Sequence, residues 1–232
     1  MEIKIVHLYP DLLNLYGDKG NISALEKRCL WRGIDAKVTE IKGDDALCLS
    51  DCDILFLGGG GGCEQEMVLE KLDKVKATLK EYIESSGTAL FVCGGFQMAG
   101  ALGLIDVTHK KAKKRASGNV VFELILDGKK ILVSGFENHE YETDIHDLTP
   151  LGNVLVGYGN NGMGFEGAIY KNVFASNLHG PLLPKNPVLC DYIIKKVLDK
   201  KYGGDNILKP ISDNFENIAS KNIITQVLGE DK

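Results

Sequence analysis

The stretch Thr88-Ala-Leu-Phe-Val-Cys93-Gly-Gly-Phe-Gln97 predicts a short buried strand that turns sharply into a helix. Cys93 stands at the turn, and the two glycines after it let strand and helix pack closely. A thiol at a helix N-terminus lies beside free backbone N–H groups, which lower its pKa and can stabilise an oxyanion. The stretch therefore indicates a nucleophile elbow, although a buried cysteine with no chemical role fits this stretch alone about equally well.

The chain before this stretch alternates predicted strands with a predicted helix. Residues 2–7 predict a first strand, and Asn21 can cap a helix that ends at Gly33. Residues 34–38 then alternate like a half-exposed strand. Units of this kind predict a parallel sheet with helices on its faces.

A run of five glycines, residues 58–62, follows the buried strand predicted for residues 53–57. The apolar stripe after the glycines predicts one long helix over residues 64–85. In a parallel sheet, ligands bind at the carboxyl ends of the strands. The glycine run and Cys93 should therefore open onto the same crevice, where glycines let backbone N–H groups approach a ligand.

The second half of the chain has a different pattern. Asp127-Gly128 is a tight-turn signal between residues 120–126 and 131–133, which together predict a β-hairpin. Short strands follow, among them residues 168–174, and Asn186-Pro187 predicts the start of a helix.

These patterns predict an α/β fold of the flavodoxin-like type. It would have a mostly parallel sheet with helices on both faces, plus short antiparallel strands in the second half. We expect one domain over residues 1–202. Residues 203–232 are predicted to form a tail packed on or beside it, with one helix that begins near Ser212.

The composition is that of a globular protein. Hydrophobic residues make up 44% and charged residues 25% of the 232 residues, and no apolar run reaches the roughly 18 residues of a membrane span. The net charge of -5 argues against a nucleic-acid partner. The six cysteines lack the spacing of zinc ligands, and the N-terminus lacks a signal-peptide pattern. We therefore expect a cytoplasmic protein with no metal site and no membrane insertion.

Five histidines are candidates for the base that a catalytic cysteine needs. His179 follows an apolar strand and precedes the sharp Gly180-Pro181 turn, so its ring can be presented at the end of a strand. His139 is a second candidate at another predicted strand end, whereas His109 and His146 have polar surroundings that are typical of the surface. Spacing alone favours His179 only modestly.

Two glycine-rich patterns do not predict a nucleotide site. The five-glycine run lacks the Gly-Lys-Ser/Thr ending of a P-loop, because Cys63-Glu-Gln65 follows it. Residues 157–162 match G-x-G-x-x-G, but another glycine-rich stretch stands where the helix of that motif would begin. We therefore expect no nucleotide cofactor in this chain.

Several short strings occur in order over residues 2 to about 190. They are His7-Leu-Tyr-Pro10, Tyr16-Gly-Asp-Lys-Gly-Asn21, Gly58-Gly-Gly60 with Glu64-Gln65, Cys93-Gly-Gly-Phe-Gln97, Arg115 with Gly118-Asn119, Gly135-Phe-Glu-Asn-His139 and Leu178-His-Gly-Pro-Leu-Leu-Pro-Lys-Asn-Pro187. Most are weak individually, but their joint presence in this order is highly specific. With them the chain resembles the class I glutamine amidotransferases, more narrowly the cobyric-acid-synthase-like branch, and most closely the glutaminase subunits of lipid II isoglutaminyl synthases.

The resemblance implies a role for each matching residue. Cys93 would be the nucleophile, and His179 the base that keeps it as a thiolate and later protonates the leaving ammonia. Gly60 and Gly94 would donate N–H groups to the oxyanion. Gln97, one helical turn beyond Cys93, would help hold the substrate glutamine.

Two further positions have more than one interpretation within the same resemblance. Arg115 would bind the α-carboxylate of glutamine, although a solvated basic loop explains it equally well. Class I glutaminases usually carry an acid two residues after the histidine, and here that position is Pro181. A Cys-His dyad, or an acid from elsewhere such as Asp18 or Glu137, remains open.

The resemblance also implies a partner. The family forms a heterodimer with a Mur-ligase-like synthetase, which would carry ATP and Mg²⁺ and amidate the D-glutamate of lipid II, the peptidoglycan precursor. This chain has no Walker lysine with which to activate a carboxylate. It would hydrolyse glutamine through a Cys93 thioester and deliver ammonia. The alternatives are a glutaminase for another synthetase, as in cobalamin-pathway amidation, and a non-catalytic glutamine-binding module.

Overall fold

The structure is a computed structural model that describes residues 1–229 and contains two β-sheets. In spatial order, sheet A consists of β2 (Asp35–Ile41), β1 (Glu2–Leu8), β3 (Ile54–Leu57), β4 (Thr88–Val92), β10 (Val173–Ser176) and β9 (Ala168–Tyr170). Sheet B consists of β11 (Leu178–His179), β6 (Lys129–Asp144), β5 (Thr108–Leu126), β7 (Gly152–Val156) and β8 (Phe165–Glu166). The helices are α1 (Lys19–Leu30), α2 (Gly62–Lys74), α3 (Lys76–Glu84), α4 (Gly94–Ala101), α5 (Pro187–Tyr202) and α6 (Asn214–Leu228), with a 3₁₀ turn η1 (Leu183–Lys185).

Sheet A confirms the predicted parallel α/β sheet. Strands β2, β1, β3, β4 and β10 are parallel, and only the edge strand β9 runs antiparallel to its neighbour. Their order is that of flavodoxin-like folds, in which the chain reverses its direction of winding between β1 and β3. The loops at the carboxyl ends of β1, β3 and β4 therefore meet at the position where such folds bind ligands.

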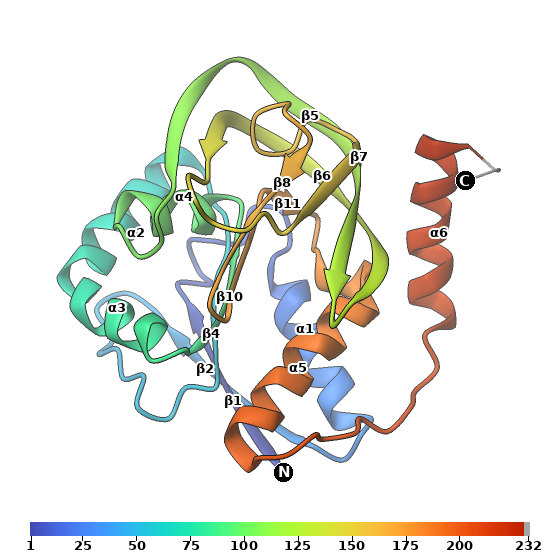
Figure 1. Cartoon of the computed structure of the whole chain (residues 1–232). Coiled ribbons are helices and arrows are strands. Elements are labelled where there is room, and N and C mark those ends of the chain that lie inside the picture. Colours follow the sequence, from blue (N-terminus) through green and yellow to red (C-terminus); the bar gives the residue numbers. More distant parts are fainter. Residues whose placement is uncertain (230–232) are drawn as a thin grey trace.

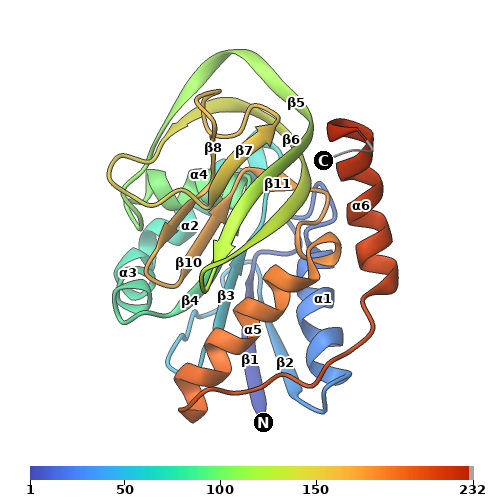
Figure 2. The same cartoon turned by 45° about the vertical axis from the view of Figure 1, so that its right-hand side comes forward.

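Helices cover both faces of sheet A (Figures 1 and 2). On one face, Leu25 of α1 and Ile193 of α5 are fully buried, and on the other Leu72 of α2 and Ile83 of α3 are fully buried. Burial of each such side chain contributes about 1.5–3 kcal/mol relative to exposure. The two apolar layers hold the strand ends in place.

Sheet B is antiparallel and lies over the β4–β10 end of sheet A (Figure 1). The expectation of short strands is confirmed for β7, β8 and β11 but was wrong for β5 and β6, which pair from Thr108 and Asp144 to Leu126 and Lys129. The register shifts between Lys111 and Ala116, where basic side chains stand exposed on the strand. The apolar pattern marks only the part of this hairpin that faces the core.

Three local predictions were wrong in whole or in part. The predicted helix over residues 64–85 is divided at Val75 into α2 and α3. α1 begins at Lys19, and Asn21 lies inside it with its side-chain oxygen accepting the N–H of Leu183. α5 begins at Pro187 with Asn186 at its N-cap position, as predicted, but the Asn186 side chain makes no cap hydrogen bond and instead bonds Ser134 and Leu182.

The C-terminal segment runs without helix from residue 203 to residue 213, and α6 then begins two residues after the predicted start. α6 packs beside η1 and the β5–β6 hairpin, and Ser220 lies in hydrogen-bond contact with Ser134 (3.1 Å). The guanidinium of Arg28 binds both Asp191 of α5 and Asp213 at the start of α6. Residues 230–232 of the predicted tail lie outside the described residues. Within residues 1–229, no helix is long and apolar enough to cross a bilayer.

Candidate active site

Cys93 occupies the predicted turn between β4 and α4. Its backbone angles are φ 51° and ψ −109°, a conformation that a non-glycine residue adopts only at an energetic cost of about 1–3 kcal/mol. Its N–H donates to the carbonyl of Ser176 on β10 (2.8 Å), and its own carbonyl accepts the N–H of Gln97 (3.1 Å). The strained turn is therefore fixed from both sides.

The glycines around Cys93 allow a very close approach of backbones. A Cβ at Gly95 would lie 2.1 Å from the carbonyl oxygen of Leu57 at the end of β3. A Cβ at Gly59 would lie 3.3 Å from the Cβ of Cys93 and 3.2 Å from the nitrogen of Gly94. The glycine run thus lies against the elbow, as predicted from the strand order.

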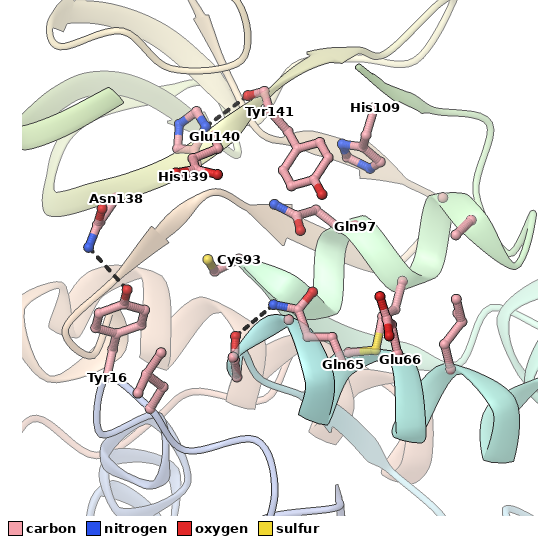
Figure 3. A pocket seen from close by; sticks show the side chains of 18 of the residues that line it. Tyr16, Gln65, Glu66, Cys93, Gln97, His109, Asn138, His139, Glu140 and Tyr141 are labelled. Atoms are coloured by element: carbon pink, nitrogen blue, oxygen red, sulfur yellow. Dashed lines mark hydrogen bonds between the residues drawn. The ribbon is translucent and has the colours of Figure 1, made fainter. Parts of the chain in front are cut away.

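A cavity of about 640 Å³ opens above the elbow (Figure 3). Of the predicted site residues, Cys93, Gly60, Gln97 and Arg115 line it. Other residues that line it include Tyr16, Gln65, His109, Asn138, His139 and Tyr141. This volume is in the range of small-molecule sites. No group of three or more potential metal ligands occurs among residues 1–229.

The backbone N–H groups of Gly59 and Gly94, both near the thiol, have different hydrogen-bond partners. The N–H of Gly59 donates to Oδ2 of Asp18 (2.7 Å), so it is not free for a ligand. The Gly60 peptide is oriented through its carbonyl, which accepts a hydrogen bond from Gln65 Nε2 (2.7 Å; Figure 3). The N–H of Gly94 hydrogen-bonds the thiol of Cys93 and acts to lower its pKa.

At Cys93, burial outweighs the lowering of the thiol pKa by the N–H of Gly94. The side chain is only 6% exposed, and burial, followed by the nearby Asp18 carboxylate, raises the pKa of the thiol to about 12. The expectation that the helix N-terminus lowers this pKa was therefore wrong in net effect. The cause is that desolvation of a thiolate costs more here than the bond from Gly94 supplies.

His179 lies on β11, opposite Phe136 of β6, and is not among the residues that line the cavity. Its ring stacks on the ring of Tyr16, with centroids 4.0 Å apart, and Tyr16 does line the cavity. Burial lowers the pKa of His179 to about 4, and a hydrogen bond with the backbone of Asn138 partly opposes the shift. The side chain of Asn138 donates to the hydroxyl of Tyr16 (3.0 Å; Figure 3).

Neither acid considered for orienting His179 forms an ion pair with it within the described chain. Asp18 is fully buried, and burial raises the pKa of its carboxyl to about 6 despite the bond from Gly59. Glu137 accepts the N–H groups of Tyr158 (2.7 Å) and Gly159 (2.9 Å). The G-x-G-x-x-G match therefore marks a loop whose N–H groups hold a carboxylate of this chain.

Two histidines have other positions than expected. His139 lies inside β6, not at its end, and its Nδ1 contacts the Tyr141 carbonyl (2.8 Å; Figure 3). Burial acts to lower its pKa, but the Glu137 carboxylate 3.5 Å from Nε2, together with the Tyr141 carbonyl and the Glu166 carboxylate, outweighs burial, and the net pKa is raised. His109 is half-buried against Thr143 (3.0 Å) and lines the cavity, so its prediction as a surface residue was wrong.

Tyr16, Asn138 and His109 all line the cavity, although no sequence pattern predicted a place in the site for them. Tyr16 and Asn138 stand within strings quoted for the resemblance, so their position in those strings was the available signal. His109 carried none, because its neighbours in the chain are polar.

The chain has a parallel sheet of flavodoxin-like order, a strained cysteine at the end of β4 and a glycine loop against that cysteine. These features define it as an α/β protein with a nucleophile elbow. The chain belongs to the CobB/CobQ-like glutamine amidotransferase domain family, whose model matches residues 4–187.

Curated relatives match nearly the whole chain. The subunit GatD of the glutamine-hydrolysing lipid II isoglutaminyl synthase of Staphylococcus aureus is 39% identical, over 96% of this chain and 95% of its own length. The protein of the same name from Streptococcus pneumoniae is 34% identical, over 96% of this chain and 89% of its own length. A probable cobyric acid synthase of Methanococcus maripaludis is 27% identical over 88% of this chain, which covers 42% of that protein.

Solved structures share the fold at low sequence identity. A structure of PurLQS from Thermotoga maritima has a TM-score of 0.62 at 18% identity, covering 86% of this chain and 99% of the other. The glutaminase domain of CTPS from Trypanosoma brucei, with bound acivicin, has a TM-score of 0.59 at 11% identity, covering 89% of this chain and 96% of the other. These similarities support the fold of the chain.

Proposed function

We propose that this chain is the glutaminase subunit of a lipid II isoglutaminyl synthase. The observation that carries the proposal is the strained elbow at Cys93, with its thiol facing a cavity lined by polar groups, in a chain 39% identical to a glutamine-hydrolysing subunit. The released ammonia passes to a Mur-ligase-like synthetase, which binds ATP and Mg²⁺ and amidates the D-glutamate of lipid II.

Cys93 attacks the side-chain amide carbon of glutamine, and His179 takes the thiol proton and gives it to the leaving ammonia. The amide carbon–nitrogen bond breaks as ammonia leaves, and water then cleaves the γ-glutamyl thioester to glutamate and free thiol. The N–H groups of Gly60 and Gly94 stabilise the oxyanion, since that of Gly59 is engaged by Asp18. Gln97 helps hold the substrate glutamine.

Arg115 binds the α-carboxylate of glutamine in this proposal. It lines the cavity and already pairs with Glu140 (3.0 Å) at the cavity wall. A guanidinium presents several donors in the fork geometry that suits a carboxylate. The basic neighbours of Arg115 at residues 110–114 do not line the cavity, which favours a specific role for Arg115 over a solvated basic loop.

A dyad without a third acid agrees with the surroundings of His179. The backbone of Asn138 and the ring of Tyr16 hold the imidazole, and no carboxylate pairs with it in the part of the chain that the structure describes. Burial disfavours both the thiolate of Cys93 and the imidazolium of His179. We therefore expect slow turnover by the chain alone and faster turnover with the synthetase bound.

The test measures ammonia and glutamate release from glutamine by the purified chain, alone and with a Mur-ligase-like synthetase, ATP, Mg²⁺ and lipid II. Turnover should disappear in Cys93→Ala and His179→Ala and persist in Cys63→Ala, a matched change of an exposed cysteine in the first turn of α2. A diazoketone analogue of glutamine should label Cys93 and not Cys63.

Amidated lipid II in that assay identifies the acceptor. Ammonia release without amidated lipid II would leave a glutaminase that serves another synthetase, such as one for cobalamin-pathway amidation. Absence of both turnover and Cys93 labelling, with the synthetase present, would refute the enzymatic proposal and favour a glutamine-binding module.

A further inference from the structure

The bend between β10 and β11 connects the two halves of the site. β10 lies in sheet A beside β4, and β11 lies in sheet B beside β6, with only Asn177 between them. At one end of the bend the carbonyl of Ser176 accepts the N–H of Cys93 (2.8 Å), and at the other end stands His179. One short piece of backbone therefore sets the positions of both the thiol and the imidazole.

The side chain of Glu166, on β8, holds this bend. Its Oε1 accepts the hydroxyl of Ser176 (2.7 Å) and the N–H of Asn177 (2.9 Å), and its Oε2 accepts the side-chain amide of Asn177 (3.2 Å). The same hydroxyl of Ser176 accepts the N–H of Leu178 (3.0 Å). The N–H groups at the change of sheet are thus bound to side chains.

Glu166 is itself held in place. Asn160 clamps the next residue of the chain, Gly167, by accepting its N–H and donating to its carbonyl, both at 2.9 Å. The oxygen of Asn160 also accepts the side-chain amide of Asn177 (2.9 Å). The result is a closed set of hydrogen bonds between β8, its following loop and the bend.

Burial of the Glu166 carboxyl group has a free-energy cost, which argues that the residue has a role beyond packing. Glu166 is 0% exposed, and burial of a carboxyl group costs several kcal/mol unless hydrogen bonds compensate. A backbone bend could be closed by a neutral side chain at lower cost. Burial raises the pKa of Glu166, opposed by the bonds from Ser176 and Asn177.

We propose that Glu166 is the positioning residue that sets His179 relative to Cys93, acting through the Ser176–Leu178 backbone. It acts on His179 by an indirect route, since Pro181 stands two residues after the histidine and no carboxylate within residues 1–229 forms an ion pair with it. The inference rests on the proposed function, since a Cys-His pair matters only if Cys93 reacts.

The test uses Glu166→Gln, which keeps the shape of the side chain but replaces one accepting oxygen with a donor facing Asn177. In glutamine hydrolysis we expect kcat to fall about 10- to 100-fold, the scale of a misplaced reacting group, with KM within about twofold. Iodoacetamide should alkylate Cys93 more slowly at neutral pH, with a pH profile approaching that of His179→Ala. If Glu166 acted only through its charge, its loss would favour the thiolate and speed alkylation.

A matched control is Asn186→Asp, which alters one atom in another fully hydrogen-bonded buried side chain, whose hydrogen-bond partners are Ser134 and Leu182 and not Cys93 or the bend. It should lower the melting temperature and leave kcat within about twofold. If Glu166→Gln does not fold, Ser176→Ala is the second variant, because it removes the hydroxyl that joins Glu166 to Leu178 and keeps the carbonyl that holds Cys93. We expect for it the same slower alkylation.

The double variant Glu166→Gln/His179→Ala gives the sharpest result. If Glu166 acts through His179, the double variant should be alkylated no more slowly than His179→Ala alone. The inference would be overturned if the losses of alkylation rate in the double variant were additive, or if Glu166→Gln were alkylated faster than wild type. It would also be overturned if Glu166→Gln changed only KM, or if Asn186→Asp lost as much kcat. A pH profile of alkylation that is the same in wild type and His179→Ala would overturn it as well. Alkylation of Cys93 needs neither glutamine nor the synthetase, so it tests the positioning role independently of turnover. If glutamine is not hydrolysed but the alkylation profile still depends on His179, the proposed function is refuted and the positioning role of Glu166 is not.

Discussion

Cys93 is held by the backbone of the elbow and by the Ser176 carbonyl, whereas His179 is held by the Tyr16 ring and the backbone of Asn138. The elbow depends on β4, on α4 and on the close approach of Gly95 to the end of β3. His179 depends on Tyr16 from the loop after β1 and on Asn138 from β6. The nucleophile is therefore fixed by backbone sterics and backbone hydrogen bonds, and the base by an aromatic stack and a backbone hydrogen bond, so the two should respond differently to substitution.

The largest effect is expected for Gly95→Ala. The added Cβ would meet the Leu57 carbonyl oxygen at 2.1 Å, and two backbones would have to separate. We expect a loss of more than about 3 kcal/mol in unfolding free energy, at the upper end of overpacking effects. Gly118→Ala is the control, since its Cβ meets no atom within 4 Å. Chemical denaturation of both proteins measures the difference, and equal stability would show that the elbow does not depend on this close approach.

Arg115→Ala should raise KM for glutamine with little change in kcat. A hydrogen bond to a charged group contributes about 1.5–3 kcal/mol, so kcat/KM should fall about 10- to 100-fold. Lys114→Ala removes an equal charge from the neighbouring exposed position and should change KM less than about twofold. Equal effects of the two substitutions in steady-state assays would assign Arg115 to the general basic surface, not to the glutamine site.

Tyr16→Ala tests the tertiary support of His179. Without the stacked ring, water reaches the imidazole, and its pKa should rise from about 4 toward its ordinary value near 6.5. His179 would then become protonated at a higher pH than in wild type. The acid limb of the alkylation profile should therefore shift to higher pH, and the alkylation rate at pH 5.5 should fall about tenfold. Tyr16→Phe keeps the stacking and should retain the wild-type limb. An unshifted limb in Tyr16→Ala would mean that other groups bury His179.

The smallest effect at neutral pH is expected for His7→Leu, in β1 of sheet A. Burial lowers the pKa of His7 to about 4, so between pH 6.5 and 4 the unfolded chain binds a proton there that the folded chain does not. This contribution weakens the fold as pH falls through that window. Relative to wild type, His7→Leu should therefore gain up to about 1.4 kcal/mol of unfolding free energy per pH unit below 6.5. Denaturation curves at pH 7, 6 and 5 measure this, and a constant difference would contradict it.

Sequence patterns predicted the parallel sheet and the elbow because both are periodic or local. Alternation and apolar runs locate β1, β3 and β4, and two glycines after Cys93 indicate the turn. The length of β5 and β6 was missed because their outer halves carry polar and basic side chains on both faces. A hairpin that leaves the core has no apolar alternation to reveal it.

The surroundings of His179 could not be predicted for a different reason. Glu166 and Glu137 look like ordinary charged residues in the sequence, and only the folded chain places them in buried hydrogen-bonded positions. The side chains of Asn21 and Asn186 were interpreted as helix caps because that is the commonest local use of asparagine. Their bonds to partners 162 and 52 residues away are invisible to any local pattern.

The five-glycine run after β3 has a consequence for how this sequence can vary. Added Cβ atoms at its first three positions would meet Asp18 (2.8 Å), Gly94 (3.2 Å) and Leu13 (2.8 Å). At Gly61 the obstacle is only the flexible side chain of Glu64, and at Gly62 there is no atom within 4 Å. The five glycines therefore comprise three positions at which neighbouring atoms exclude a side chain and two at which they do not. In a saturation mutagenesis library, only Gly61 and Gly62 should accept larger side chains.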